Sequence, residues 1–196
     1  MRQPPTALML FAAGFGTRMG ALTADRPKPL IPVAGRPLID HALDLAGQAG
    51  IGRVVVNVHY KGDQIVRYLE GRKIAISDET ACILDTGGGL RNALPLLGNG
   101  PVFTLNADAV WTGANPLTQL HQAWDPARME ALLLLLPVAQ AAPPSGRSDF
   151  CWTPKGGLCG QAGRRAWSIS ARRSSRPMPW ARSPMRCSRS TVCGTA

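Results

Sequence analysis

The chain has 196 residues, a formal net charge of +10 and a pI of about 10.3. Its length allows one domain with a buried core, and its longest apolar run, residues 131–136, is far shorter than the roughly 20 residues that cross a bilayer. Residues 1–140 carry 12 Lys+Arg and 11 Asp+Glu, whereas residues 141–196 carry 10 Lys+Arg and only Asp149 as an acid. The basic charge therefore belongs to the tail and gives the first part no nucleic-acid-binding character.

Two hydrophobic periods alternate along the first 140 residues. Residues 7–13 form a continuous apolar run that predicts a buried strand, and residues 37–49 place apolar side chains on one helical stripe. The same patterns then predict strands at 53–59, 73–77, 101–106 and 131–138, and helices at 62–69, 88–97 and 115–124. This alternation predicts an α/β fold, a Rossmann-like three-layer α/β/α arrangement with a mainly parallel sheet.

The loop after the first strand, residues 12–18 (AAGFGTR), lies where parallel sheets bind their ligands. Gly14 and Gly16 let the backbone approach a triphosphate, and Arg18 can donate two hydrogen bonds to phosphate oxygens. An ordinary tight turn is the alternative. The loop has neither the third glycine of a dinucleotide fingerprint nor the Gly-Lys-Ser/Thr of a Walker A loop.

Two charged residues are candidates for the same site as the glycine loop. Lys28 stands between Pro27 and Pro29, which limit where its ammonium can go, and a fixed lysine can neutralise charge during phosphoryl transfer. Asp108 follows the strand at 101–106, where a carboxylate among cations suggests Mg²⁺. Taken singly, each also suits a structural role, a surface turn for Lys28 and a helix cap or turn for Asp108.

Taken together, these motifs resemble a known family. Residues 10–39 (LFAAGFGTRMGALTADRPKPLIPVAGRPLI) are similar, in order and spacing, to the first signature of the sugar-1-phosphate nucleotidyltransferases. Residues 77–79 (SDE), 84–89 (LDTGGG) and 106–111 (NADAVW) resemble the branch of that family that uses UTP and N-acetylmuramate 1-phosphate. The resemblance covers residues 6–150, and Asp85 departs from it, since the family commonly has glutamate there.

The resemblance implies a role for each matching residue. Arg18 and Lys28 are expected to be catalytic, Lys28 by stabilising the transition state, and Asp108 is expected to bind the catalytic Mg²⁺. Asn106 is expected to lie near the sugar phosphate. The residues expected to contact the nucleotide are Ala12, Ala13, Gly14, Gly16, Thr17, Arg18, Thr86 and Gly88.

The implied reaction is in-line attack of a sugar phosphate oxygen on the α-phosphorus of UTP, which releases pyrophosphate without a covalent enzyme intermediate. We expect a cytoplasmic enzyme of peptidoglycan recycling with no membrane or nucleic-acid partner. His41, His59 and His121 fall on helix or strand patterns and are interpreted as structural. Three alternatives remain: an enzyme that makes GDP-mannose or dTDP-glucose, a non-catalytic nucleotide-binding module, or a nucleic-acid-binding protein.

The tail follows neither period, so we expect a nucleotidyltransferase core at 1–150 and an aberrant basic tail at 151–196, disordered or poorly packed, that leaves the sheet incomplete. A genuine basic tail, a nucleic-acid-binding arm and a frame-shifted ending compete as explanations. Shifted by one base, residues 187–196 (CSRSTVCGTA) can read Phe-Ser-Leu-Asn-Arg-Leu-Trp-Asp-Arg, which resembles a segment that the family has there. The frame shift is the hypothesis that we favour.

A frame-shifted ending would remove a second metal-binding aspartate that the resemblance implies. One carboxylate alone binds Mg²⁺ weakly. We therefore expect this polypeptide to bind nucleotide but to have little or no catalytic activity. Sequencing the gene across codons 145–155 tests the hypothesis, since an uninterrupted frame would contradict it.

Overall fold

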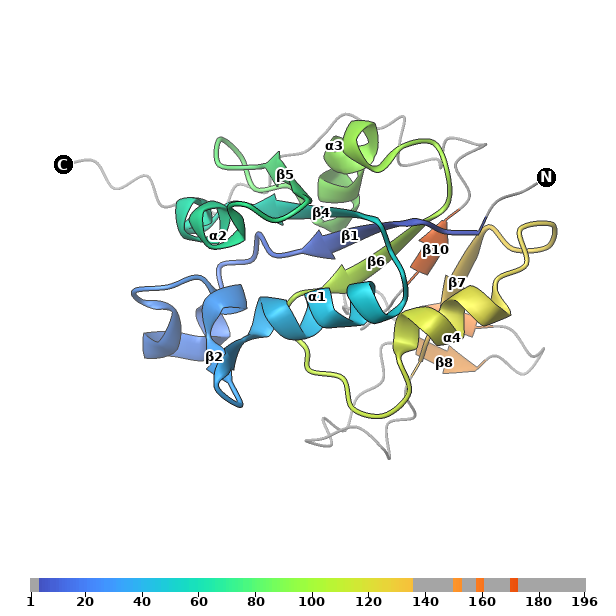
Figure 1. Ribbon diagram of the computed structural model, residues 1–196, viewed down its shortest axis with the longest axis horizontal. Coiled ribbons are helices and arrows are strands. Elements are labelled where there is room, and N and C mark those ends of the chain that lie inside the picture. Colours follow the sequence, from blue (N-terminus) through green and yellow to red (C-terminus); the bar gives the residue numbers. More distant parts are fainter. Residues whose placement is uncertain (1–3, 136–149, 153–157, 161–169, 173–196) are drawn as a thin grey trace.

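The structure, a computed structural model, describes residues 4–135 and the backbone of three short segments, 150–152, 158–160 and 170–172 (Figure 1). The fold of the described part is a sheet with helices on both faces. Most of the basic tail lies outside the described residues, so its predicted disorder stays a prediction. In the described part, no helix is both long enough and apolar enough to cross a membrane.

The central sheet has six strands in the order β5-β4-β1-β6-β10-β7. Its strands are β1 (Ala7–Phe11), β4 (Arg53–Val58), β5 (Ile74–Asp78), β6 (Val102–Asn106), β7 (Ala131–Leu133) and β10 (Ser170–Arg172). The first four along the chain pair in parallel, with Phe11 opposite both Asn57 and Asn106. β10 runs antiparallel between β6 and β7. The mainly parallel sheet predicted from the sequence is confirmed.

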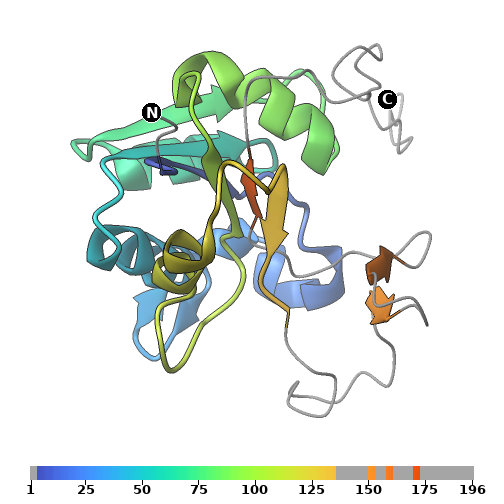
Figure 2. The same ribbon diagram turned by 90° about the vertical axis from the view of Figure 1, so that its right-hand side faces the viewer.

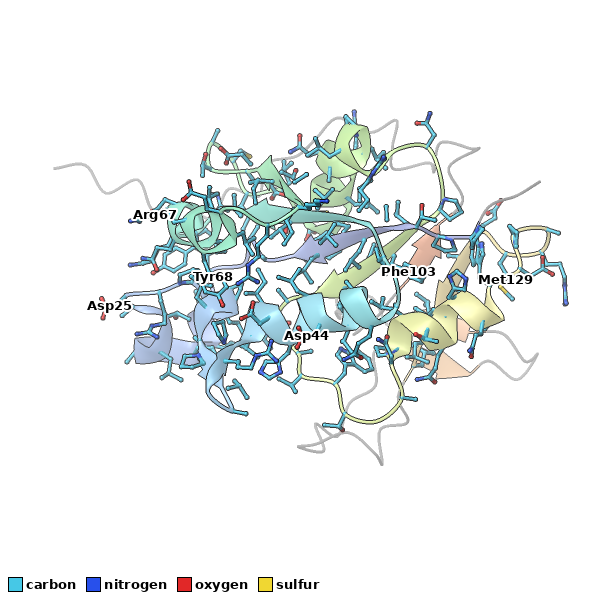
Figure 3. All side chains as sticks on the ribbon, in the orientation of Figure 1. Asp25, Asp44, Arg67, Tyr68, Phe103 and Met129 are labelled. Atoms are coloured by element: carbon cyan, nitrogen blue, oxygen red, sulfur yellow. The ribbon has the colours of Figure 1, made fainter. Side chains whose placement is uncertain are left out.

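Alternate residues of β1 build the two layers of the core. Leu8 and Leu10 pack in one cluster with helices α1 (Leu38–Gln48), α2 (Gly62–Leu69) and α4 (Pro116–Ala123). Ala7 and Met9 pack on the other face, against α3 (Thr86–Leu97). Figure 1 shows α3 on one side of the sheet and α1 and α4 on the other. Phe103, 1% exposed, belongs to the larger cluster (Figure 3).

Several short elements have no counterpart among the predicted ones. Two 3-10 helices, η1 (Thr17–Thr23) and η2 (Lys28–Leu30), and a hairpin of β2 (Pro32–Val33) and β3 (Arg36–Pro37) connect β1 to α1. Elements this short carry no apolar period. In the tail, β8 (Phe150–Trp152) and β9 (Leu158–Gly160) pair antiparallel (Figure 2). β10 was not predicted either.

A side-chain cluster joins α1 to α2. The Tyr68 hydroxyl, on α2 (Figure 3), donates to Asp40 Oδ2 at 2.5 Å, and Arg72 Nη1 donates to Asp40 Oδ1 at 2.8 Å. Burial of the Asp40 carboxyl raises its pKa, but these two hydrogen bonds outweigh that effect, so the pKa of Asp40 lies below its ordinary value of 3.8. The ionised carboxylate therefore stabilises the fold.

Asp40→Asn will lower the free energy of unfolding by about 1 kcal/mol at neutral pH, because two hydrogen bonds to a charged group are weakened. Since the folded-state pKa is lowered, this stabilisation is present above the ordinary pKa of 3.8 and is lost as the pH falls through the lowered value. Urea unfolding over a pH series measures it. Asp44→Asn is the control, because the Arg36–Asp44 ion pair is about half exposed and should contribute almost nothing.

Candidate functional site

The loops that follow β1 and β6 meet at one edge of the sheet. The two strands are direct neighbours, and the Ala107 amide continues their pairing by donating to the Phe11 carbonyl at 3.0 Å. Parallel pairing thus brings the glycine loop and Asp108 to the same end, as the sequence predicted. Asn106 ends β6 in a half-buried position opposite Phe11.

Gly16 holds the bend of the glycine loop. Its backbone has φ +66, in the left-handed region, and a Cβ there would lie 2.8 Å from Thr23 Cγ2 and 3.1 Å from Lys28 Cβ. The Thr23 hydroxyl donates to the carbonyls of Gly16 at 3.3 Å and Gly20 at 3.1 Å, and the Tyr60 hydroxyl donates to the Thr23 carbonyl at 3.0 Å. The loop is therefore folded tightly onto the stem of Lys28.

The most polar contact at this edge joins two predicted site residues. Lys28 Nζ donates to Asp108 Oδ2 at 2.6 Å, and the two side chains are 21% and 27% exposed. Lys28 begins η2, with Pro27 extended before it and Pro29 buried after it. The prolines and the short helix fix the direction in which the lysine leaves the backbone. The sequence predicted each residue for this site but not their ion pair.

Asp108 has an oxygen that suits a cation. Its Oδ1 is buried and has no hydrogen-bond partner, although buried carboxylate oxygens normally have one. An oxygen of this kind fits the ligand set that Mg²⁺ prefers. Within the described residues, however, no group of three His, Cys, Asp or Glu side chains could hold a metal. The residues present therefore fit one protein ligand, Asp108, for a metal whose other ligands would be substrate and water oxygens.

The remaining predicted residues lie in the glycine loop and at the start of α3. Gly14 and Arg18 are exposed in the glycine loop, and so is Thr17, whereas Ala12 and Ala13 are buried beneath it. Thr86 and Gly88 lie in the first turn of α3, because Asp85 caps the helix through the Thr86 amide at 2.9 Å. Asp85 thus has a local structural role at the position where the sequence departs from the family.

Two buried residues that the sequence analysis did not select belong to this region. Asn57 and Glu79 are each 3% exposed, and they hydrogen-bond to each other and to backbone amides of the surrounding loops. A signal existed, since Asn57 interrupts the apolar run VVVNV of β4. His59 Nδ1 donates to the Glu79 carbonyl at 2.7 Å, and its ring meets Phe15 edge-on at 5.2 Å, in agreement with a structural role.

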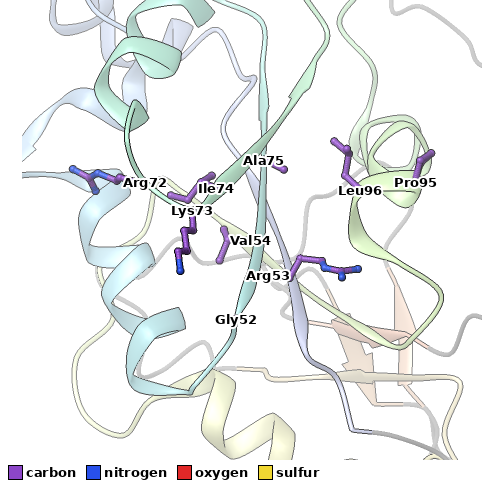
Figure 4. A pocket seen from close by; sticks show the side chains of 9 residues that line it. All are labelled: Gly52, Arg53, Val54, Arg72, Lys73, Ile74, Ala75, Pro95 and Leu96. Carbon is purple, nitrogen blue, oxygen red and sulfur yellow. The ribbon is translucent and has the colours of Figure 1, made fainter.

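A pocket of about 610 Å³ lies at the other end of the sheet, against the amino ends of β4 and β5 and the last turn of α3 (Figure 4). Arg53, Arg72 and Lys73 contribute its charge, but the charged ends of Arg53 and Arg72 point away from each other. Arg72 is held by Asp40, and Arg53 Nη1 donates to the Leu97 carbonyl at 3.2 Å. The pocket is therefore separate from the glycine loop and offers no converging set of cations.

Comparison with known proteins gives the chain its relatives. A family model described as the MobA-like NTP transferase domain matches residues 8–154. An N-acetylmuramate alpha-1-phosphate uridylyltransferase of Caulobacter vibrioides is 48% identical over 145 residues, which cover 69% of this chain and 60% of that protein. The mannose-1-phosphate guanylyltransferase catalytic subunit beta of Dictyostelium discoideum is 37% identical over 109 residues, which cover 52% of this chain and 30% of that protein.

A solved structure supports the fold. A UDP-glucose pyrophosphorylase from Acinetobacter baumanii superimposes with a TM-score of 0.62 over 87% of this chain and 75% of that one, at 17% sequence identity. The agreement at so low an identity concerns the Rossmann-like fold alone. The chain spans 60% of the Caulobacter relative and 30% of the Dictyostelium one, less than two thirds of either.

Proposed function

This chain belongs to the family of MobA-like NTP transferase domains, and we propose that the protein transfers UMP from UTP to N-acetylmuramate 1-phosphate, giving UDP-N-acetylmuramate and pyrophosphate. The observation that carries the proposal is the Lys28–Asp108 ion pair beside the glycine loop, at the carboxyl edge of a parallel sheet. The choice of UTP and of the sugar rests on the Caulobacter relative. The proposed place is the cytoplasm, in peptidoglycan recycling.

The chain's own residues are proposed to position the two substrates and to stabilise the negative charge of the transition state. Backbone amides of Gly14, Gly16 and Thr17, with the Arg18 guanidinium, would bind the triphosphate, while Thr86 and Gly88 in the first turn of α3 would lie near the base or sugar. Asn106 would orient the sugar phosphate for in-line attack on the α-phosphorus. Lys28 would leave Asp108 for the phosphate oxygens, where it offsets the negative charge of the transition state.

Asp108 is the proposed magnesium ligand, through its partnerless Oδ1. When bound there, Mg²⁺ supplies charge neutralisation to the phosphate oxygens. One protein carboxylate is few for a divalent cation, so we retain the expectation that this polypeptide turns over slowly or not at all. We also retain the division into a core at 1–150 and a basic tail at 151–196.

A second candidate has an observation in its favour. The Dictyostelium relative is named as a mannose-1-phosphate guanylyltransferase, so an enzyme that forms GDP-mannose is the alternative to the UTP-dependent one. A glucose-1-phosphate thymidylyltransferase is a further alternative of the same class. A non-catalytic nucleotide-binding module is the alternative of another class, favoured by the lack, among the residues that the structure describes, of a group of three side chains able to hold a metal.

The deciding experiment measures pyrophosphate release from UTP, Mg²⁺ and N-acetylmuramate 1-phosphate. It compares this chain with a version whose ending is restored to the shifted frame, and it repeats each assay with GTP and mannose 1-phosphate and with dTTP and glucose 1-phosphate. Activity of the restored version with UTP alone supports the proposal and the frame shift together. Nucleotide binding without turnover in either version would favour the binding module.

A further inference from the structure

A chain of three hydrogen bonds crosses the sheet beneath the proposed nucleotide site. The Ala12 amide, at the start of the glycine loop, donates to Asn57 Oδ1 at 2.7 Å. Asn57 Nδ2 donates to Glu79 Oε1 at 2.8 Å, and the Leu84 amide donates to Glu79 Oε2 at 3.0 Å. The relay, defined as Ala12–Asn57–Glu79–Leu84, thus joins the loop after β1 to the loop that leads into α3.

The direction of each bond in the relay is fixed by its ends. A backbone amide can only donate, so the Ala12 amide must face the oxygen of Asn57, and the Asn57 amino group must then face Glu79. The Leu84 amide is a second pure donor, so both oxygens of Glu79 must accept. A carboxyl group meets this requirement with its two oxygens, and an amide side chain in its place cannot, because the amide nitrogen only donates.

The two side chains of the relay are buried. Asn57 and Glu79 are each 3% exposed, and a Cβ on Gly89 would lie 2.7 Å from Glu79 Oε1 and 3.1 Å from Asn57 Nδ2. Burial holds the pKa of Glu79 above its ordinary value of 4.5, because the hydrogen bonds from Asn57 and Leu84, which lower the pKa, only partly offset the burial. A buried carboxylate is costly compared with an apolar side chain of the same volume. Its two ends, however, are loops that carry proposed nucleotide contacts: Ala12 to Arg18 on one side, Thr86 and Gly88 on the other.

We propose that Asn57 and Glu79 are positioning residues, which hold the phosphate-binding loop after β1 and the loop before α3 at the fixed separation that a bound nucleoside triphosphate requires. This inference rests on the proposed function for its ligand. Neither residue touches the nucleotide. They act through the amides of Ala12 and Leu84, and loss of one bond should free both loops.

The structure allows a reversal of the relay as a test. Glu79→Gln places an amino group against either Asn57 or Leu84, and Asn57→Asp places two carboxylates face to face, so each single variant loses a bond. The double variant Asn57→Asp with Glu79→Gln restores all three. In the double variant, the new carboxylate at position 57 accepts from the Ala12 amide and from the side-chain NH2 of the new glutamine at position 79. The side-chain carbonyl of that glutamine accepts from the Leu84 amide. The net charge of the chain is unchanged.

The experiment measures three quantities on the 196-residue chain: the Kd of MgUTP by calorimetry, the Tm, and hydrogen exchange at the Ala12 and Leu84 amides without ligand. Each single variant should weaken UTP binding by about tenfold or more, since Glu79→Gln sets two buried donors face to face and Asn57→Asp sets two buried carboxylates face to face. Each should also speed exchange at both amides. The double variant should recover both readouts. Asn92→Ala is the control, because it removes a bond of 3.0 Å between α3 and Ser77 of β5 without touching either loop; it should lower the Tm and leave the Kd unchanged.

Two results would overturn the inference. One is a double variant that binds UTP no better than the single variants while its Tm matches theirs. The other is a single variant whose Ala12 and Leu84 amides exchange faster while its Kd stays at the wild-type value. If the wild-type chain binds no nucleoside triphosphate, the proposed function fails, and exchange at Ala12 in the Glu79→Gln variant still decides whether the relay couples the loops.

Discussion

Lys28→Met will lower the rate of pyrophosphate release by about 100-fold or more, because a fixed cation beside the reacting phosphates is lost. The rate is measured in the version with the restored reading frame. The free energy of unfolding should change by less than about 1 kcal/mol, since an ion pair that is partly open to water contributes little. The Lys28–Asp108 pair, 21% and 27% exposed, is of this kind.

Two further variants separate the charge of Lys28 from other effects. Lys73→Met is the matched control, because this exposed lysine lies at the opposite end of the sheet and its loss should leave the rate unchanged. Asp108→Asn should also lower the rate, and it should raise the Mg²⁺ concentration needed for half-maximal rate, whereas Lys28→Met should not change that concentration. A Lys28→Met enzyme within about threefold of the wild-type rate would contradict the role given to the lysine.

Gly16→Ala will destabilise the fold by about 2–3 kcal/mol and abolish measurable UTP binding, because a methyl group is forced into a left-handed backbone and a filled space. The new Cβ would lie 2.8 Å from Thr23 Cγ2 and 3.1 Å from Lys28 Cβ at φ +66. Thr23 also holds the loop through its hydroxyl, so its displacement would open the bend. Chemical denaturation and calorimetry with MgUTP measure the two effects.

Gly14→Ala separates stability from binding in the same loop. A Cβ at Gly14 would meet nothing within 4 Å, and the backbone there is not left-handed, so the free energy of unfolding should stay the same. UTP binding should still weaken if the backbone of this loop approaches the phosphates closely. Unchanged binding in Gly14→Ala would place the triphosphate elsewhere, whereas equal loss of stability in both variants would contradict the packing described for Gly16.

The helices and strands with a regular apolar pattern were predicted well from the sequence. The helix α2 (Gly62–Leu69) has the predicted bounds, and β1, β4, β5 and β6 differ from prediction only at their ends, because apolar periods mark buried faces. η1, η2 and the β2–β3 hairpin escaped prediction, since glycine and proline interrupt residues 17–37 and leave no regular apolar period there. α3 begins two residues earlier than predicted because Asp85 caps it.

The sequence predicted that residues of this candidate site lie at one end of the sheet, but it did not predict their contacts. Gly16, Lys28 and Asp108 stood out through residue type and position after strands, and parallel pairing brings them to one edge. The Lys28–Asp108 bond joins residues 80 apart, and the Asn57–Glu79 bond joins residues 22 apart. Contacts of this kind depend on register and side-chain direction, which no local pattern records.

The position of β1 in the sheet has a consequence for the newly made chain. β1 is synthesised first, yet its partners are β4 and β6, and Ala7 pairs with Arg53 on one side and Val102 on the other. Until β6 has left the ribosome, β1 keeps one open edge, and the glycine loop stays apart from Asp108. Such long-range pairing is slow to form and leaves strand edges open to other chains. The glycine loop therefore meets Asp108 only after β6 has been made, and a chain stalled before residue 102 would be prone to aggregate.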